Sequence, residues 1–257
     1  LLFQDDILRV QQKAEDINKA NIIYEVFQNN NRLEYHSEKS VFMSKKEATI
    51  TLNNKAMKAA NSYKYLGDIF TDNNSYNLMI DTRAATIRGT TAELVSILTE
   101  IPQTLKMNAV ISYFHAIVTP RLLLNAETWC NLTKTNIENL EKVQNSAIKR
   151  ILKLPISTPS TILRSELGIW SISHQISYKQ LMYYRRVLTM KNNITNSILE
   201  EQRNLPGPTW VREISSLMKD LSIRENKEEI EKMSKFRWKN LVKSAISYRE
   251  NSNLDQI

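Results

Sequence analysis

The sequence predicts an α+β fold that is mostly helical, and two observations lead to this prediction. Up to Asn74, short apolar runs separated by turn residues alternate with one helical repeat. Beyond Asn74, apolar residues recur at intervals of three and four, which indicates amphipathic helices. The chain has 257 residues, 42% of them hydrophobic, so it can build one large domain or two small ones.

The N-terminal stretch predicts a β-hairpin that carries two adjacent carboxylates. An apolar run leads into Asp5 and Asp6, after which Ile7 and Leu8 resume the apolar pattern. Two carboxylates at or near a tight turn offer the hard oxygen ligands that Mg²⁺ takes. The alternative is an ordinary solvated turn, in which such residues are common.

A helix and short strands follow this hairpin. Residues 13–29 repeat apolar positions at spacings of three and four, which predicts an amphipathic helix. Its apolar stripe consists of Ile17, Ala20, Tyr24 and Phe27. A strand is predicted over residues 49–52, with a turn at Asn53 and Asn54.

Beyond Asn74, prolines and capping residues divide the helical pattern. A long helix is predicted up to Pro102, and a second helix is predicted to end at Pro120. The stripe of the long helix consists of Ala84, Ile87, Thr91, Leu94 and Leu98. Residues 135–138, Thr-Asn-Ile-Glu, predict a capping box for a third helix that stops before Pro155.

The C-terminal part is predicted to be helical as well. Thr158 is expected to cap a short helix that ends before Gly168, and Thr209 is expected to cap a further helix. One highly charged helix is predicted over residues 225–249, followed by a disordered tail from Asn251.

Composition indicates which kind of partner the protein binds and in which compartment it is expected. The net charge of +8 favours a polyanion, and with four glycines the chain has no glycine-rich phosphate loop. A single cysteine, Cys130, excludes an intramolecular disulfide and a cysteine-rich zinc site. The use of cysteine fits an intracellular, reducing location, nuclear or cytoplasmic. No apolar run approaches the length of a membrane span, and no membrane partner is expected. Because the chain starts at Leu1 inside a predicted strand, we expect it to be the later part of a longer polypeptide.

Short motifs in a fixed order carry the functional prediction. They are Phe-Gln-Asp-Asp at 3–6, Lys39-Ser40, Tyr-Lys-Tyr-Leu-Gly at 63–67, Pro-Arg-Leu-Leu-Leu-Asn-Ala-Glu-Thr-Trp at 120–129, the helix over 140–154, and Leu-Arg-Ser-Glu-Leu-Gly at 163–168. This ordered set resembles the non-LTR (LINE-type) retrotransposon reverse transcriptases over residues 1–190. Gln4 departs from the pattern, since alanine is more usual there.

The resemblance implies a division into three regions. Residues 1–76 would be the C-terminal part of a polymerase palm with its primer-grip strand, residues 77–155 a helical thumb, and residues 156–257 a helical extension. The implied activity is that of an RNA-directed DNA polymerase, which transfers dNTPs to a primer 3′ end. The implied partners are an RNA template, a DNA primer and dNTPs, with the rest of the polymerase upstream.

The same resemblance implies roles for the acidic pair and a lysine. Asp5 and Asp6 would hold Mg²⁺, and Lys39 would donate a proton to the leaving pyrophosphate. The alternative for Lys39 is a surface lysine. The second metal-binding aspartate of the family lies on an upstream strand that these residues lack, so the chain is expected to be inactive alone.

Two further groups of residues are expected to contact nucleic acid. Tyr65, Leu66 and Gly67 would shape the strand that positions the primer, although Gly67 could also mark a simple bulge. A basic set on the third long helix could follow the backbone of a duplex, or form only a solvated face. That set is Lys142, Lys149, Arg150 and Lys153.

Other residues and other functions are weighed against this interpretation. Phe3 and Trp129 are expected to be core residues, and Cys130 a buried small apolar residue. One alternative function is a non-catalytic nucleic-acid-binding remnant of such an element. Another is a helical protein–protein scaffold whose basic surface has no ligand.

Overall fold

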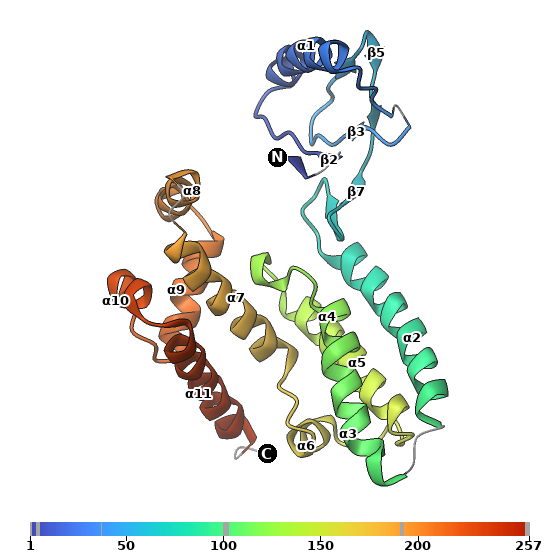
Figure 1. Cartoon of the computed structure of the whole chain (residues 1–257), viewed down its shortest axis with the longest axis vertical. Coiled ribbons are helices and arrows are strands. Elements are labelled where there is room, and N and C mark those ends of the chain that lie inside the picture. The colour runs from blue at the N-terminus through green and yellow to red at the C-terminus, as the bar shows by residue number, and fades with distance from the viewer. Residues whose placement is uncertain (1, 4–5, 37, 100–102, 191–192, 255–257) are drawn as a thin grey trace. The chain divides into compact units, whose positions relative to one another are not determined.

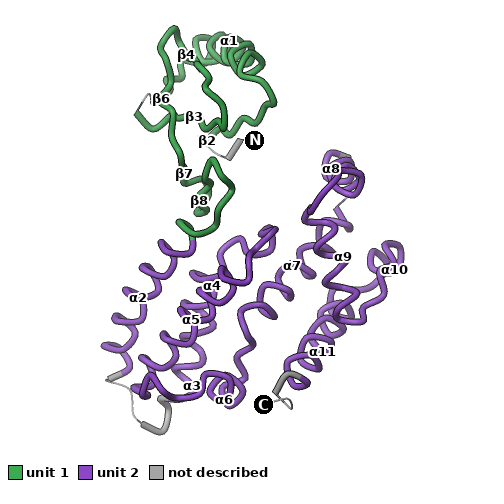
Figure 2. Tube along the Cα trace, turned by 180° about the vertical axis from the view of Figure 1, so that it is seen from behind, with its two compact units in different colours: residues 1–79 green, residues 80–257 purple. Residues whose placement is uncertain are grey.

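The chain is mostly helical and folds as two compact units. The computed structural model describes residues 2–3, 6–36, 38–99, 103–190 and 193–254. These residues form helices and a few short strands, which agrees with the predicted α+β class (Figure 1). The compact units comprise residues 1–79 and 80–257 (Figure 2). The predicted boundary at residue 76 lies close to this division, whereas the one at residue 155 falls inside the second unit.

The first unit contains short paired strands. The antiparallel pairs are β1 (Leu2–Phe3) with β2 (Asp6–Ile7), β4 (Thr51–Leu52) with β5 (Lys55–Ala56), and β7 (Ser62–Tyr65) with β8 (Asp68–Thr71), and the parallel pair is β3 (Val41–Phe42) with β6 (Lys58–Ala59). The predicted N-terminal hairpin is therefore present. The predicted turn at Asn53 and Asn54 is confirmed, and both residues have positive φ, as a two-residue hairpin turn demands.

Helix α1 (Ala14–Asn31) confirms the predicted helix and part of its predicted buried face. The buried residues of α1 are Asn21 and Gln28, and Ile17 and Tyr24 of the predicted stripe are half-buried on the same side of the helix. Phe27, at the edge of the stripe, is 52% exposed, so the centre of the buried face lies slightly to one side of the predicted stripe.

Polar contacts explain which face of α1 is buried. The side chain of Asn18 accepts a hydrogen bond from the Thr51 N–H at 3.0 Å and donates to the Thr49 carbonyl at 3.1 Å. Asn21 donates to the Thr51 carbonyl at 2.6 Å. These side-chain amides form hydrogen bonds that a neighbouring strand would otherwise form with this backbone. They anchor α1 to β4 and to the residues just before it.

The second unit is built from helices. They are α2 (Asn77–Thr99, which begins in the first unit), α3 (Gln103–Tyr113), the π-helix η1 (Phe114–Val118), α4 (Thr119–Leu122), the 3₁₀-helix η2 (Ala126–Thr128), α5 (Lys134–Ile151), α6 (Ser160–Glu166), α7 (Ile172–Thr189), α8 (Asn193–Asn204), α9 (Trp210–Asp220), α10 (Lys227–Lys232) and α11 (Lys235–Leu254). The predicted stripe of α2 is confirmed, because all five of its members are buried. None of the described helices combines the length and apolarity needed to cross a bilayer.

The predicted helix end at Pro120 is wrong. The chain passes from α3 through η1 into α4, and Pro120 lies in the first turn of α4. Proline removes one backbone N–H donor from this continuous helical run, and the wide turn of η1 lies directly before α4. In η1 the Thr119 N–H donates to the Phe114 carbonyl, five residues earlier. The predicted break at Pro102 lies outside the described residues.

The N-cap of helix α5 lies two residues before the predicted N-cap, Thr135. Thr133 is the N-cap, and its hydroxyl accepts a hydrogen bond from the Asn136 N–H at 3.1 Å. In turn, the Thr133 N–H donates to the side-chain oxygen of Asn136 at 3.2 Å. The capping box predicted at 135–138 is therefore wrong. The observed box pairs Thr133 with Asn136, whereas the prediction looked for a glutamate at the second position.

The short helix α6 matches its predicted end but not its predicted cap. It starts after Pro159, which carries no capping group, so Thr158 is not the cap. Gly168 follows the helix with φ of 63°, and its N–H donates to the Ser165 carbonyl at 3.1 Å. This left-handed glycine C-cap confirms the predicted position of Gly168.

The C-terminal helices are more divided and extend further than predicted. Thr209 caps α9 as predicted. The single helix predicted over 225–249 is wrong, because Met233 is extended and Ser234 caps the new helix α11. Helix α11 continues to Leu254, so the tail predicted to be disordered from Asn251 is helical where it is described.

Helix α7 lies at the centre of a buried cluster formed by the C-terminal helices. Leu181 and Tyr184 of α7 pack with Ile214 of α9 and with Trp238 and Val242 of α11. The Trp238 indole N–H donates to the Leu181 carbonyl at 3.1 Å, which satisfies a polar group inside this core.

Two carboxylates from other helices cap the start of α7. Glu250 of α11 accepts hydrogen bonds from the Ser171 N–H at 3.1 Å, from the Ser171 hydroxyl at 2.9 Å and from His174. Glu141 of α5 accepts from the Ile172 N–H at 2.5 Å. Negative charge is favourable at a helix N-terminus, where N–H groups lack partners within the helix.

The two capping carboxylates differ in pKa. Burial raises the pKa of Glu141, and Arg164, 3.4 Å away, only partly offsets this effect. Burial acts in the same direction on Glu250, but the hydrogen bonds from His174 and Ser171 outweigh it, so the pKa of Glu250 is lowered. The fold therefore favours the ionised form of Glu250, whose charge contributes to stability at neutral pH.

Replacing Glu250 should destabilise the protein in a pH-dependent way. We expect Glu250→Gln to lower the free energy of unfolding at pH 7 by about 1–2 kcal/mol. A lowered pKa in the folded state stabilises above the ordinary value of 4.5, and this stabilisation is lost as the pH falls through the folded pKa. Urea unfolding at pH 7 and pH 3 should therefore show a larger deficit at pH 7 than at pH 3. The exposed Glu200→Gln is the control, and an equal deficit at both pH values would contradict this role of Glu250.

Candidate nucleic-acid interface

The predicted acidic pair is only partly described. Asp6 opposes Phe3 in the β1–β2 ladder, whereas Asp5 lies outside the described residues. Over the described ranges, no three His, Cys, Asp or Glu side chains gather as a metal site. The metal-binding role of Asp5 and Asp6 stays a prediction.

Lys39 lies in an exposed turn that follows α1. Its N–H donates to the His36 carbonyl at 3.1 Å. This hydrogen bond fixes the backbone at Lys39 and leaves the ammonium on the surface, so its role toward pyrophosphate stays a prediction.

The predicted primer-grip residues form a hairpin end rather than a continuous strand. Tyr65 is the last residue of β7 and opposes Asp68 of β8. Leu66 and Gly67 form the connection, with φ of 48° and 88°. Two positive φ values suit a two-residue hairpin turn, so the strand and the bulge predicted for Gly67 are both wrong. Leu66 is 44% exposed in a conformation that is uncommon for a bulky residue.

The four basic residues predicted on one face of α5 do not form one surface. Lys142 and Arg150 line the same pocket. Lys149 instead donates from its ammonium to the Ile156 carbonyl at 2.8 Å, which ties down the loop after α5. Lys153 follows the end of α5 with φ of 55°. Neighbouring residues of a helix point about 100° apart, which separates Lys149 from Arg150.

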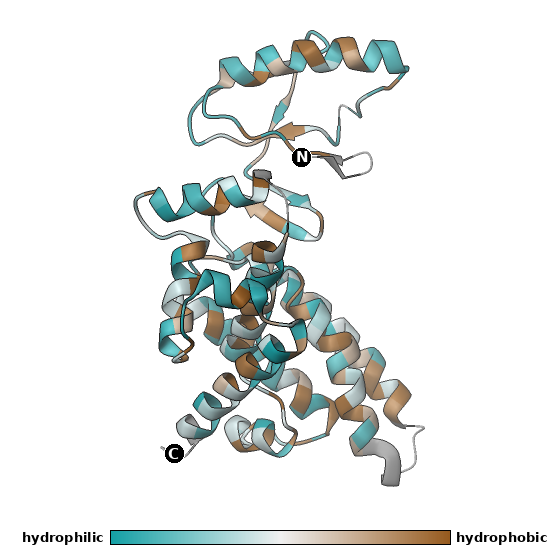
Figure 3. Ribbon diagram, turned by 60° about the vertical axis from the view of Figure 1, so that its left-hand side comes forward, coloured by the Kyte–Doolittle hydropathy of each residue, from teal (hydrophilic) through white to brown (hydrophobic). Residues whose placement is uncertain are grey.

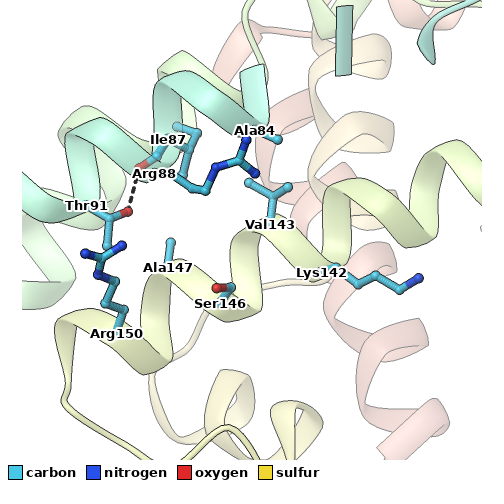
Figure 4. A pocket seen from close by; sticks show the side chains of 9 residues that line it. All are labelled: Ala84, Ile87, Arg88, Thr91, Lys142, Val143, Ser146, Ala147 and Arg150. Atoms are coloured by element: carbon cyan, nitrogen blue, oxygen red, sulfur yellow. Dashed lines mark hydrogen bonds between the residues drawn. The ribbon is translucent and has the colours of Figure 1, made fainter. Parts of the chain in front are cut away.

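The pocket lies between α2 and α5 and has a volume of about 210 Å³ (Figure 4). Its lining consists of Ala84, Ile87, Arg88, Thr91, Lys142, Val143, Ser146, Ala147 and Arg150. Figure 4 shows Arg88 reaching from α2 into the space between the helices and Arg150 reaching from α5 toward Thr91. Lys142 extends away from both.

The lining of this pocket carries positive charge without a compensating carboxylate. It includes Arg88, Lys142 and Arg150, all three exposed, and it includes neither Asp nor Glu. A guanidinium offers a planar set of N–H donors that matches the oxygens of a phosphate. Two guanidinium groups from facing helices can therefore bind one phosphate or two neighbouring phosphates.

Sequence analysis missed Arg88, and nearby arginines show why it is the relevant one. Arg83 is buried, lies 4.7 Å from the centre of the Trp129 ring and donates to the Leu122 carbonyl at 3.0 Å. Arg121 donates to the Thr90 hydroxyl at 2.5 Å. These arginines hold helices together, whereas Arg88 faces solvent. The position of Arg88 beside the buried stripe of α2 could have revealed it. Trp129 is a core residue, as predicted.

Cys130 is a partly exposed thiol rather than a buried apolar residue. Burial raises its pKa to about 12, and the charge of Glu213, which accepts a hydrogen bond from the thiol, acts in the same direction. A thiol with this pKa stays protonated at neutral pH, so Cys130 is not suited to nucleophilic catalysis.

The cluster of Ser171, His174 and Glu250 is not a catalytic triad. Both Ser171 and Glu250 contact the same ring nitrogen of His174, Nδ1. A triad uses the opposite nitrogens, so that the base is oriented on one side and deprotonates the nucleophile on the other. This cluster is therefore assigned to the capping of α7.

Comparison of the chain with known proteins found no match among family models, curated proteins or solved structures. The described geometry consequently supplies the physical argument for function, and it centres on the pocket between α2 and α5.

Alkylation of Cys130 should be slow and should depend on Glu213. With a pKa of about 12, only about one thiol in ten thousand is ionised at pH 8. We expect Glu213→Gln to lower the pKa and accelerate reaction with iodoacetamide at pH 8, because a negative charge beside the thiolate is removed. Rates measured from pH 7 to 10 test this, with urea-unfolded protein as the control. A midpoint near 9 in the folded wild type would contradict it.

Proposed function

We propose that the helical unit binds the phosphates of a nucleic-acid duplex through the pocket between α2 and α5. The observation that carries this proposal is the pair of exposed arginines, Arg88 and Arg150, which line one pocket without a carboxylate. The net charge of +8 favours the same class of partner. Contacts to phosphates rather than base edges predict binding with little sequence preference.

We further propose that the chain is part of an RNA-directed DNA polymerase of the non-LTR retrotransposon type. The ordered motifs support this proposal, and the N-terminal hairpin gives Asp6 a defined position opposite Phe3. Asp5 and Asp6 would hold Mg²⁺ with their carboxylate oxygens. When bound, the ion would stabilise charge on the transferred phosphoryl group and the leaving pyrophosphate. Lys39 would provide a proton to that pyrophosphate.

The exposed apolar surface of α1 supports a role for the first unit inside a larger domain. Ile22, Ile23 and Val26 are 62%, 73% and 56% exposed, and α1 carries brown apolar bands among its polar residues (Figure 3). Exposing several large apolar side chains of one helix to water is unfavourable, so another surface is expected to cover them. The remaining part of a polymerase palm would provide that surface.

A non-catalytic nucleic-acid-binding remnant is the second candidate function. The arginine pocket supports it equally well, because phosphate binding needs no metal site. The natural upstream sequence separates the two candidates. A strand with a second aspartate and fingers-type elements favours the polymerase, and a gene without them favours the remnant.

The duplex-binding proposal predicts a specific loss in a double variant. We expect Arg88→Gln with Arg150→Gln to weaken binding of RNA–DNA duplexes of any sequence and to flatten the dependence on salt by about two units, one for each lost phosphate contact. Glutamine favours helices, so α2 and α5 should persist. Fluorescence anisotropy over a salt series measures binding, and circular dichroism checks folding.

The matched control removes the same amount of positive charge from the second unit, at positions outside the pocket. Lys134→Gln with Lys153→Gln removes two exposed cations that do not line the pocket. Equal losses in the two double variants would attribute binding to diffuse charge and would refute the proposed pocket.

The polymerase proposal predicts that Asp5 is essential in a polypeptide that also carries the upstream strand. Asp5→Asn should reduce primer extension with Mg²⁺ by about a thousandfold or more, because asparagine keeps the shape but loses the charge that holds the metal. Asp81→Asn, at an exposed carboxylate of α2, is the control. Near-normal extension by Asp5→Asn would make Asp5 an ordinary turn residue.

A further inference from the structure

A second pocket lies on the helices that follow the duplex-binding region. It has a volume of about 520 Å³ and is lined mainly by α7, with Glu127 of η2 and Lys235 of α11. Helices α7 and α11 pack side by side (Figure 1), so this pocket belongs to a rigid part of the second unit. It shares no lining residue with the pocket between α2 and α5.

The second pocket is positively charged. Four cations line it, Lys179, Arg185, Arg186 and Lys235, against one carboxylate, that of Glu127. Glu127 pairs with Lys179 at 3.1 Å, which leaves three cations for a ligand. Arg186 and Lys235 are exposed. The lining therefore favours an anion that carries more than one charge.

Arg185 is held in position before any ligand arrives. Its Nε and Nη2 atoms donate to the Met233 carbonyl at 3.2 and 2.5 Å. A guanidinium has five N–H donors, so those not used for Met233 remain for an anion. A cation fixed in this way loses little conformational entropy on binding.

Two tyrosine rings line the same pocket, and tryptophans support both. The Tyr178 ring meets Trp170 edge to face at 5.7 Å between ring centres, and Tyr183 meets Trp210 at 5.8 Å. The Trp210 indole N–H donates to the Glu127 carbonyl at 2.9 Å, and this hydrogen bond holds the Trp210 ring in place against Tyr183. Both tyrosines are half-buried, so part of each remains open to the pocket.

We propose that the pocket lined by Tyr178, Tyr183, Arg185, Arg186 and Lys235 binds a single strand of nucleic acid, for which oligouridine is the probe. The cations bind successive phosphates, and unpaired bases stack on the tyrosine rings. This combination of a positive groove with aromatic surfaces is how proteins bind single strands without sequence preference. In a duplex the bases are stacked within the helix and cannot reach the tyrosines, and an acidic peptide has charge but no flat ring to stack.

The binding experiment compares two double variants with the same loss of charge. Arg186→Gln with Lys235→Gln should weaken binding of a fluorescein-labelled 12-nucleotide oligouridine by about tenfold and flatten its salt dependence by about 1.4 units. Lys239→Gln with Lys243→Gln, at exposed positions of α11 outside the pocket, should change binding less than about twofold. Equal losses, or no binding by the wild type, would overturn the proposal.

A tyrosine pair tests stacking separately from charge. Tyr183→Phe keeps the ring and should bind the oligouridine as the wild type does, whereas Tyr183→Leu should weaken binding by about tenfold. Thermal unfolding checks that both variants fold. Equal affinities of the two folded variants would exclude stacking on Tyr183 and overturn the proposal. Displacement of the oligouridine by a polyglutamate peptide at equal affinity would reassign the pocket to an acidic protein partner.

The outcome is distinguishable from that of the duplex-binding proposal. Arg186→Gln with Lys235→Gln should leave RNA–DNA duplex binding within about twofold of wild type, and Arg88→Gln with Arg150→Gln should leave oligouridine binding within the same range. Losses of both ligands in both variants would show that one diffuse surface binds them, which would overturn the separate single-strand site.

Discussion

The helical unit depends on satisfying the polar groups around α7, a helix that other helices contact along its length. The N–H groups at the start of α7 have no acceptors within the helix. The carboxylates of Glu141 on α5 and Glu250 on α11 accept hydrogen bonds from them. Gln180, also buried, donates to the Trp129 carbonyl at 2.8 Å. Because an unpaired buried polar group costs about 1–3 kcal/mol, these contacts fix which helices can surround α7.

Local patterns predicted the helices well and their ends less well. The stripe of α2 and the glycine after α6 were found because apolar spacing and left-handed caps depend on nearby residues. The start of α5 was misplaced because two threonines compete for the cap, and the choice of Thr133 depends on Asn136. The polar centre of the buried face of α1 could not be predicted, since Asn18 and Asn21 bond the backbone of β4, about thirty residues away in the sequence.

The candidate site could be predicted only in part for a similar reason. Arg150 was identified from its place on a basic helix, but its partner Arg88 lies on another helix, and sequence spacing within one helix does not bring the two together. Lys149 was grouped with Arg150 because both lie mostly off the apolar stripe of the same predicted helix. Its bond to the Ile156 carbonyl arises from how the chain leaves α5, which periodicity does not encode.

The π-helix η1 has a consequence for the geometry of the helical run that contains it. The buried residues Val110, Phe114, Val118 and Leu122 are spaced by four, and in a regular α-helix this spacing would rotate about 40° per step. The wider turn of η1, with its bond from Thr119 to Phe114, is also right-handed but rotates less per residue, which offsets this advance and keeps these side chains on the buried side. Because a π-turn accommodates one extra residue, deleting one residue from η1 would allow a regular α-turn and leave Leu122 near its present orientation, whereas a deletion within α3 would turn Val110 by about 100° relative to Leu122.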